Sequence, residues 1–189
     1  MTRALMLGTV LGGLAAFAWS TVSWELVGWH EKAMVTFQNE EEVSAVIASH
    51  AAVDGVYILP SQPRTEGMTA DQKKAAEAAA MAKYQRGPIV VAAVRRGEFG
   101  SFGQAMGLQI LSLMAGACLL TWLLLQTNGL SYARRVAFVA VAGLAAGVLV
   151  DMPNWNWWGF SGAYTAVDIA DSTITWLLAG LVIAKVARG

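Results

Sequence analysis

Polar side chains follow one face of the last apolar stretch of the chain, residues 163–184. An ionised aspartate at the centre of a bilayer costs about 2.5–3.5 kcal/mol, so two of them facing lipid would nearly cancel the apolar gain of their helix. The stripe must therefore face protein, water or an ion, unless one aspartate is protonated. On a helical wheel of about 100° per residue its members are Thr165, Asp168, Asp171, Ser172 and Thr175.

A further aspartate ends the apolar stretch that precedes this helix. Asp151 comes just before Met152 and Pro153, and a short turn joins the two stretches, so it is expected to approach Asp168. Three carboxylates on one face form a ligand set for a hard cation or a proton. The alternatives are hydrogen bonds between helices, which are the usual role of such groups, and a contact with another subunit.

The two histidines are separated by 19 residues, His30 preceding the predicted helix that His50 ends. His30 is expected at the outer membrane surface, where Glu25 and Glu31 are its acidic neighbours. Most metal sites need three or four ligands at defined spacing, so His30, Glu25 and Glu31 form only a weak candidate for a metal or acid–base site.

Recognisable catalytic signatures are missing from the sequence. It contains no GxSxG, Walker loop, HExxH or glycine-rich nucleotide turn. The sequence therefore predicts no catalytic residue and identifies no cofactor. The formal net charge of zero argues against nucleic acid as a partner, because binding nucleic acid needs a basic face.

Four apolar stretches must position these groups. Apolar residues make up 56% of the chain and charged residues 14%, against about 25% charged in soluble domains. A membrane helix needs about 20 residues. We therefore predict an α-helical integral membrane protein with a first transmembrane helix and its interfacial exit in residues 1–29, a polar block in 30–104, and a three-helix region in 105–189. Its helices are expected at about 105–126, 136–152 and 163–184.

The basic residues indicate how the chain threads the membrane. Lysine and arginine concentrate on cytoplasmic loops of membrane proteins, so both termini and the loop 127–135 are expected inside. All thirteen acidic residues then lie on the other side. We predict a multi-pass protein of the bacterial inner membrane with residues 30–104 extracytoplasmic. The residues assigned to the inside are Arg3, Arg134, Arg135, Lys185 and Arg188.

Tryptophans cluster at the predicted outer membrane interface, where their amphipathic rings are favoured. Their default role is therefore that of interfacial anchors, at the exit of the first helix and in the turn between the third and fourth: Trp24, Trp29, Trp155, Trp157 and Trp158.

The N-terminal helix has two further features. Residues 16–18 (Ala-Phe-Ala) resemble a signal-peptidase site, but apolar character continues beyond them, so an uncleaved helix is expected. Gly8 and Gly12 have GxxxG spacing, as do Gly143 with Gly147 and Gly103 with Gly107. This spacing lets helices approach closely, and packing within the bundle is the expected reason for it.

The polar block is predicted to form a small α/β unit. Strands are expected at 34–37, 56–59 and 89–94, with helices after the capping residues Asn39 and Thr69. This order allows a three-stranded sheet with parallel crossovers. Such a core would be small, so the unit is expected to need stabilising contacts with the membrane or with a partner.

These features lead to a functional hypothesis with two alternatives. The first is an accessory, assembly or structural subunit of a larger membrane complex, with the lipid bilayer and other membrane-protein subunits as partners. The second is a small cation- or proton-coupled transporter or sensor that uses Asp151, Asp168 and Asp171. The third is an enzyme on a lipid or envelope substrate that uses His30.

We expect a cysteine at Ala70 (Ala70→Cys) to react with a membrane-impermeant maleimide in intact cells, in a chain whose Cys118 is replaced by serine. Asn128→Cys is the matched control, because the basic loop should stay inside and remain unlabelled until the membrane is opened. Labelling of both positions from the same side would contradict the predicted topology.

Overall fold

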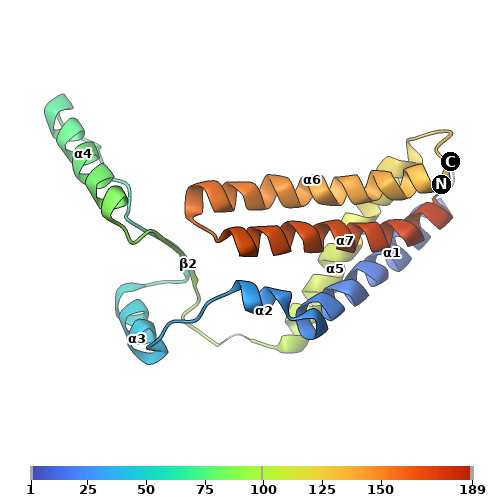
Figure 1. Ribbon diagram of the computed structural model, residues 1–189, viewed down its shortest axis with the longest axis horizontal. Helices are drawn as coiled ribbons and strands as arrows, with labels where there is room; N and C mark the ends of the chain where they lie inside the picture. Colours follow the sequence, from blue (N-terminus) through green and yellow to red (C-terminus); the bar gives the residue numbers. More distant parts are fainter. Residues whose placement is uncertain (1, 99, 188–189) are drawn as a thin grey trace. The chain divides into compact units, whose positions relative to one another are not determined.

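Four long apolar helices dominate the protein. The computed structural model describes residues 2–98 and 100–187, and these four helices are long and apolar enough to cross a membrane. They are α1 (Thr2–Val22), α5 (Phe102–Leu125), α6 (Tyr132–Trp158) and α7 (Gly162–Val186) (Figure 1). The chain thus has the helices of a multi-pass membrane protein, as its composition predicts. Arg188, assigned above to the cytoplasmic side, lies outside the described residues.

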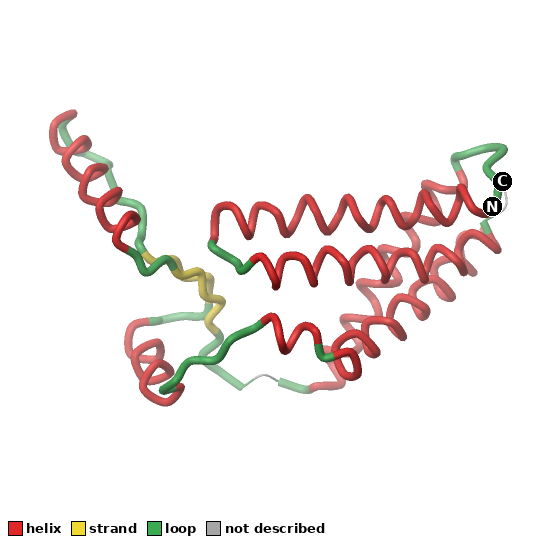
Figure 2. The backbone as a smooth tube through the Cα atoms, in the orientation of Figure 1, coloured by secondary structure: helices red, strands yellow, loops and turns green. Residues whose placement is uncertain are grey.

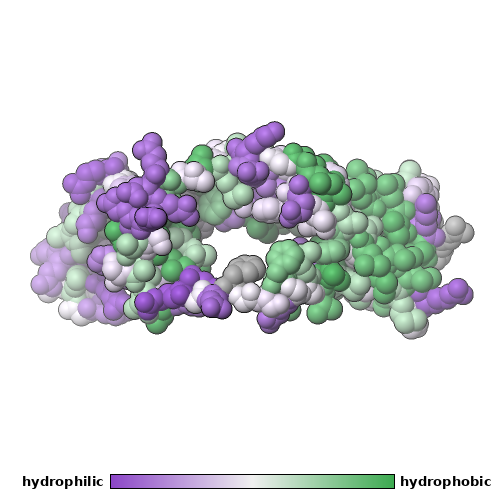
Figure 3. Space-filling view, turned by 90° about the horizontal axis from the view of Figure 1, so that it is seen from below, coloured by the Kyte–Doolittle hydropathy of each residue, from purple (hydrophilic) through white to green (hydrophobic). Residues whose placement is uncertain are grey.

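The described chain divides into two compact units. We call residues 2–35, 100–156 and 160–187 the bundle, and residues 36–98 the inserted segment, which clusters with residues 157–159. The bundle is almost entirely helical, whereas the inserted segment combines helices, loops and a small sheet (Figure 2). On the face shown in Figure 3, hydrophobic residues cover much of the bundle and hydrophilic residues gather over the inserted segment.

Helix α6 is longer than residues 136–152. It continues through Pro153 to Trp158, so the reversal into α7 is confined to residues 159–161, where Gly159 has φ 75°. The tryptophans at 155, 157 and 158 therefore lie on the last turns of α6 and not in a turn. Treating Met152-Pro153 as the helix end was wrong, because a membrane helix that packs along a neighbour tolerates a proline.

Small residues set the spacing of the bundle helices. A methyl group at Gly143 of α6 would come within 2.5 Å of Trp176 on α7, and one at Gly8 of α1 within 2.5 Å of Thr121 on α5. Backbones therefore approach closely at these points. The buried centre of the bundle includes Ala16, Ala117, Leu124, Val139, Ala179 and Ile183.

The third GxxxG pair does not serve helix packing in the described bundle. Beyond the chain neighbours and the backbone of its own helix, a methyl group at Gly107 would meet nothing within 4 Å, and one at Gly103 would meet only the Ser101 hydroxyl. Both glycines lie in the first two turns of α5. The spacing alone therefore overpredicted close contacts there.

Capping residues define the two helices of the inserted segment. Asn39 precedes α3 (Glu40–His50), and its side chain accepts a hydrogen bond from the Glu42 amide. Thr69 and Gln72 form a complete capping box at the start of α4 (Ala70–Arg86). Each cap satisfies amide groups that the first helical turn leaves without partners. Both helix starts agree with the sequence prediction.

The sheet has two antiparallel strands. Strand β1 (Gly55–Leu59) pairs with β2 (Val90–Val94), so that Gly55 faces Val94 and Leu59 faces Val90. The Arg96 amide donates to the Asp54 carboxylate at 2.9 Å, and the Arg96 guanidinium donates to the Ala52 carbonyl at 2.8 Å. These contacts close the base of the hairpin.

The predicted third strand and the parallel crossovers are wrong. Residues 34–37 form no strand, and β1 and β2 run antiparallel. A parallel crossover requires the connecting helix to pack back onto the sheet. Helix α4 consists mainly of alanine and charged or polar residues and buries no residue, so it has no apolar face with which to do this.

We expect Gly143→Ala to lower the free energy of unfolding by about 1–3 kcal/mol, because the added methyl collides with Trp176. Gly107→Ala is the matched control: its methyl meets no neighbour within 4 Å, so stability should stay equal or rise. Unfolding in mixed micelles with increasing SDS measures both. Equal stability of the two variants would contradict the packing at Gly143.

Candidate functional site

The backbone breaks sharply where α1 ends. After Val22 the chain forms a π-helical turn, η1 (Ser23–Val27), and then Gly28 takes a left-handed conformation with φ 67°. A side chain at this φ would be strained, so glycine is the residue that permits the break. The short helix α2 (Trp29–Ala33) follows and lies against α7. Wide π-helical turns often occur at functional sites.

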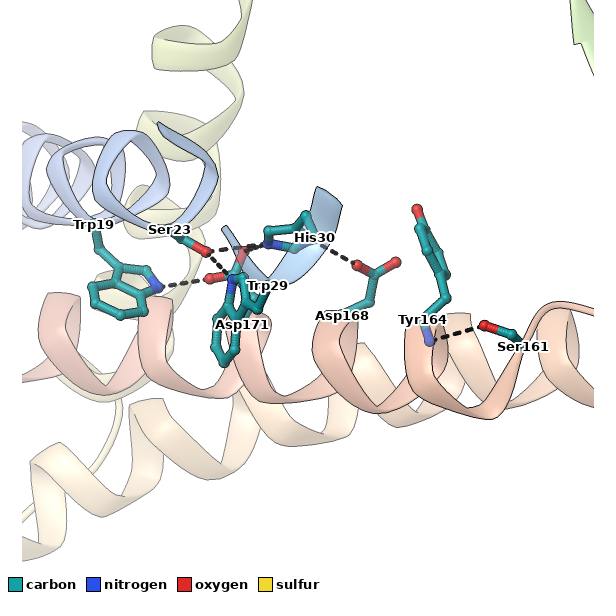
Figure 4. A network of polar contacts seen from close by, with 8 residues as sticks. All are labelled: Trp19, Ser23, Trp29, His30, Ser161, Tyr164, Asp168 and Asp171. Atoms are coloured by element: carbon teal, nitrogen blue, oxygen red, sulfur yellow. Dashed lines mark hydrogen bonds and ion pairs between the residues drawn. The ribbon is translucent and has the colours of Figure 1, made fainter. Parts of the chain in front are cut away.

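This break brings His30 into the bundle. Its side chain is 3% exposed, and each ring nitrogen faces a carboxylate of α7 (Figure 4). His30 Nδ1 lies 3.5 Å from Asp168 Oδ1, and His30 Nε2 lies 3.4 Å from Asp171 Oδ2. His30 is therefore buried within the bundle and not exposed beside Glu31, because the Gly28 turn folds α2 back onto α7.

Three further side chains complete the polar network. The Trp19 indole donates a hydrogen bond of 2.7 Å to Asp171 Oδ1. The Trp29 indole donates to Ser23 Oγ at 2.8 Å, and Ser23 Oγ lies 3.1 Å from His30 Nε2. Both carboxylate oxygens of Asp171 thus have a partner, and Ser23, which is fully buried, connects Trp29 to the imidazole.

Aromatic rings enclose the imidazole. The Trp24 ring stacks on His30 with centroids 4.0 Å apart and planes inclined by 3°, and Trp29 meets it edge-on at 5.7 Å. Trp24 and Trp29, predicted as interfacial anchors, therefore also form the wall of this site. We name four of the enclosed polar side chains the histidine cluster: Ser23, His30, Asp168 and Asp171.

The other residues of the predicted stripe divide into two groups. Ser172 donates to the Gly143 carbonyl at 3.0 Å, which joins α7 to α6, and Thr175 is buried in the bundle. Thr165 is also buried, and its hydroxyl has no hydrogen-bond partner among the described residues. The stripe thus faces protein, with Ser172 and Thr175 in structural roles and the two aspartates at His30.

Asp151 belongs to the edge of this site. It lies on α6, partly buried, close enough to Asp168 for their charges to interact. Tyr164, one turn before Asp168, stands beside that carboxylate (Figure 4). Asp151 is therefore a third carboxylate close to Asp168, outside the histidine cluster as defined above.

The weak metal candidate finds no support in this geometry. Glu25 and Glu31 are exposed, whereas His30 is buried and faces other carboxylates. Within residues 2–98 and 100–187, no group of three or more histidine, cysteine, aspartate or glutamate side chains is arranged to hold a metal ion.

Comparison of the chain with protein-family models, with curated proteins and with solved structures finds no match. Its function must therefore be argued from the residues themselves.

We expect Trp19→Phe to destabilise the bundle by about 1–2 kcal/mol, because it keeps the aromatic ring but removes the N–H donor to a partly buried carboxylate. Trp122→Phe is the matched control, since Trp122 is a half-exposed tryptophan on α5. Thermal unfolding in detergent compares the two, and equal losses would show that the Trp19 hydrogen bond contributes nothing of its own.

Proposed function

We propose that this protein is an accessory, assembly or structural subunit of a larger membrane complex, in which the inserted segment binds another protein. The supporting observation is that the inserted segment has almost no core. Across residues 36–98, only Ala51 and Pro60 are buried. Helices α3 and α4 bury no residue at all.

Apolar side chains of the hairpin remain uncovered. Val56 is 73% exposed and Ile58 is 40% exposed, and both project from one face of β1 because side chains alternate along a strand. An isolated two-stranded hairpin is marginally stable in water and gains stability when an apolar face is covered. A partner that covers this face, or adds a strand to an open edge, would supply the missing contacts.

The placement of the chain is part of the same proposal. Arg3 lies at the start of α1, Arg134 and Arg135 at the start of α6, and Lys185 at the end of α7. This distribution supports a bacterial inner membrane protein with these ends in the cytoplasm and the inserted segment on the extracytoplasmic side.

The histidine cluster favours a second candidate, a proton-coupled transporter or sensor. A buried histidine between two carboxylates inside an apolar bundle is costly to maintain, and ionisable groups at such depth commonly serve proton or ion pathways. The enzyme alternative needs an accessible His30, whereas the residue is only 2% exposed.

We expect the full chain, purified in mild detergent, to carry a second protein in fixed stoichiometry, as measured by native mass spectrometry. A variant with residues 56–93 replaced by Gly-Ser should insert but lose that protein. Because Gly55 and Val94 face each other across the hairpin, so short a link can join them.

The matched control exchanges Lys73 and Lys74, exposed residues of α4, for alanine, which preserves the hairpin face. A lone full-length monomer would contradict the proposal. Retention of the partner by the shortened chain would contradict the role of the inserted segment in binding.

A further inference from the structure

The proton positions at His30 are restricted by its surroundings. A neutral imidazole carries one N–H donor, but here each of its two nitrogens faces a carboxylate oxygen within 3.5 Å. His30 Nδ1 is buried and makes no hydrogen bond within the described residues, so the Asp168 carboxylate at 3.5 Å is the polar group that it faces. Both contacts are favourable together only when an additional proton resides on the imidazole or on a carboxylate.

We propose that His30, Asp168 and Asp171 form one proton-binding site, in which a single exchangeable proton is held between the imidazole and the two carboxylates. The inference deepens the second candidate function by naming its ligand and its residues. It requires nothing of the partner-binding proposal.

Ser23 permits two proton arrangements. When Nε2 carries a proton, it donates toward Ser23 or Asp171, and the Ser23 oxygen still accepts from Trp29. When Nε2 is bare, the Ser23 hydroxyl can donate to it, because a hydroxyl is both donor and acceptor. Asp171 Oδ2 then faces a lone pair and must itself take up a proton or move away. The site therefore has two discrete states.

The geometry favours a proton over a metal ion as the ligand. The two carboxylates face different nitrogens of the imidazole and so do not converge with it on one point. No group in the described residues is arranged to hold a metal. A proton can move between a nitrogen and an oxygen atom without several ligands that surround it.

The other titratable groups near His30 are accounted for. From α7 it faces Asp168 and Asp171, with Tyr164 and the α6 residue Asp151 beyond Asp168. On its own segment Glu25, Glu31 and Lys32 are exposed to solvent. Helix α5 contributes no charged residue. The carboxylates of α7 therefore dominate the electrostatic surroundings of the ring.

The test uses the full chain in lipid nanodiscs with ¹⁵N-labelled histidine. The sequence holds only two histidines, and exposed His50 at the end of α3 is an internal reference. Imidazole ¹⁵N shifts report which nitrogens are protonated at each pH. We expect Asp171→Asn to move the midpoint of the His30 transition to lower pH by about one unit or more, because a nearby negative charge stabilises the imidazolium.

Two controls make the result specific. Glu31→Gln removes the same charge one residue from His30, but from an exposed side chain, so it should move the midpoint by less than about 0.3 units. Asp168→Asn provides a second variant if Asp171→Asn does not fold, as checked by circular dichroism.

Three outcomes would overturn the proposal. They are an unchanged His30 midpoint in the folded aspartate variant, a single protonation state of His30 between about pH 4 and 9, and a midpoint that moves when choline chloride is replaced by sodium chloride. The last would assign the site to a cation. None of these results bears on whether a second protein co-purifies with the chain.

Discussion

Carboxylates that enter an apolar helix bundle must find compensating partners, and this requirement determines how the chain is arranged around α7. Asp171 receives an indole N–H from Trp19 and faces the imidazole of His30, while Asp168 faces the other side of the same ring. Apart from Tyr164, which stands beside Asp168 on the same helix, these compensating groups come from the first 30 residues of the chain. Trp19 lies on α1 itself, and the break at Gly28 brings His30 to the same aspartates.

Close helix packing is what allows these partners to meet. Helix α1 contacts α7 along its length, and Gly12 faces Ile183 so closely that a methyl group there would come within 2.6 Å of it. A larger residue at that position would force α1 away from α7. Trp19 and Ser23 would then withdraw from Asp171 and His30. The close contact at Gly12 thus keeps Trp19 and Ser23 within reach of Asp171 and His30.

Much of the helical structure could be predicted from sequence, because apolar length and capping residues act locally. The aspartate stripe of α7 and the caps at Asn39 and Thr69 follow from helical spacing alone. The position of His30 could not be derived in this way. It depends on a π-helical turn and one left-handed glycine. If that turn lay a few residues earlier or later, the His30 side chain would face water and not α7. The predicted parallel sheet was wrong because a parallel pair of strands needs a connecting helix that packs on the sheet. Helix α4 has no apolar face with which to do so.

Helix α4 has one more consequence, for the order in which the chain acquires structure. It buries no residue, and it is delimited by its own capping box and by Gly87. Alanine-rich sequences of this kind form helix with little help from the rest of a protein. Residues 70–86 can therefore become helical as soon as the ribosome has produced them, before α5, α6 and α7 exist to complete the bundle.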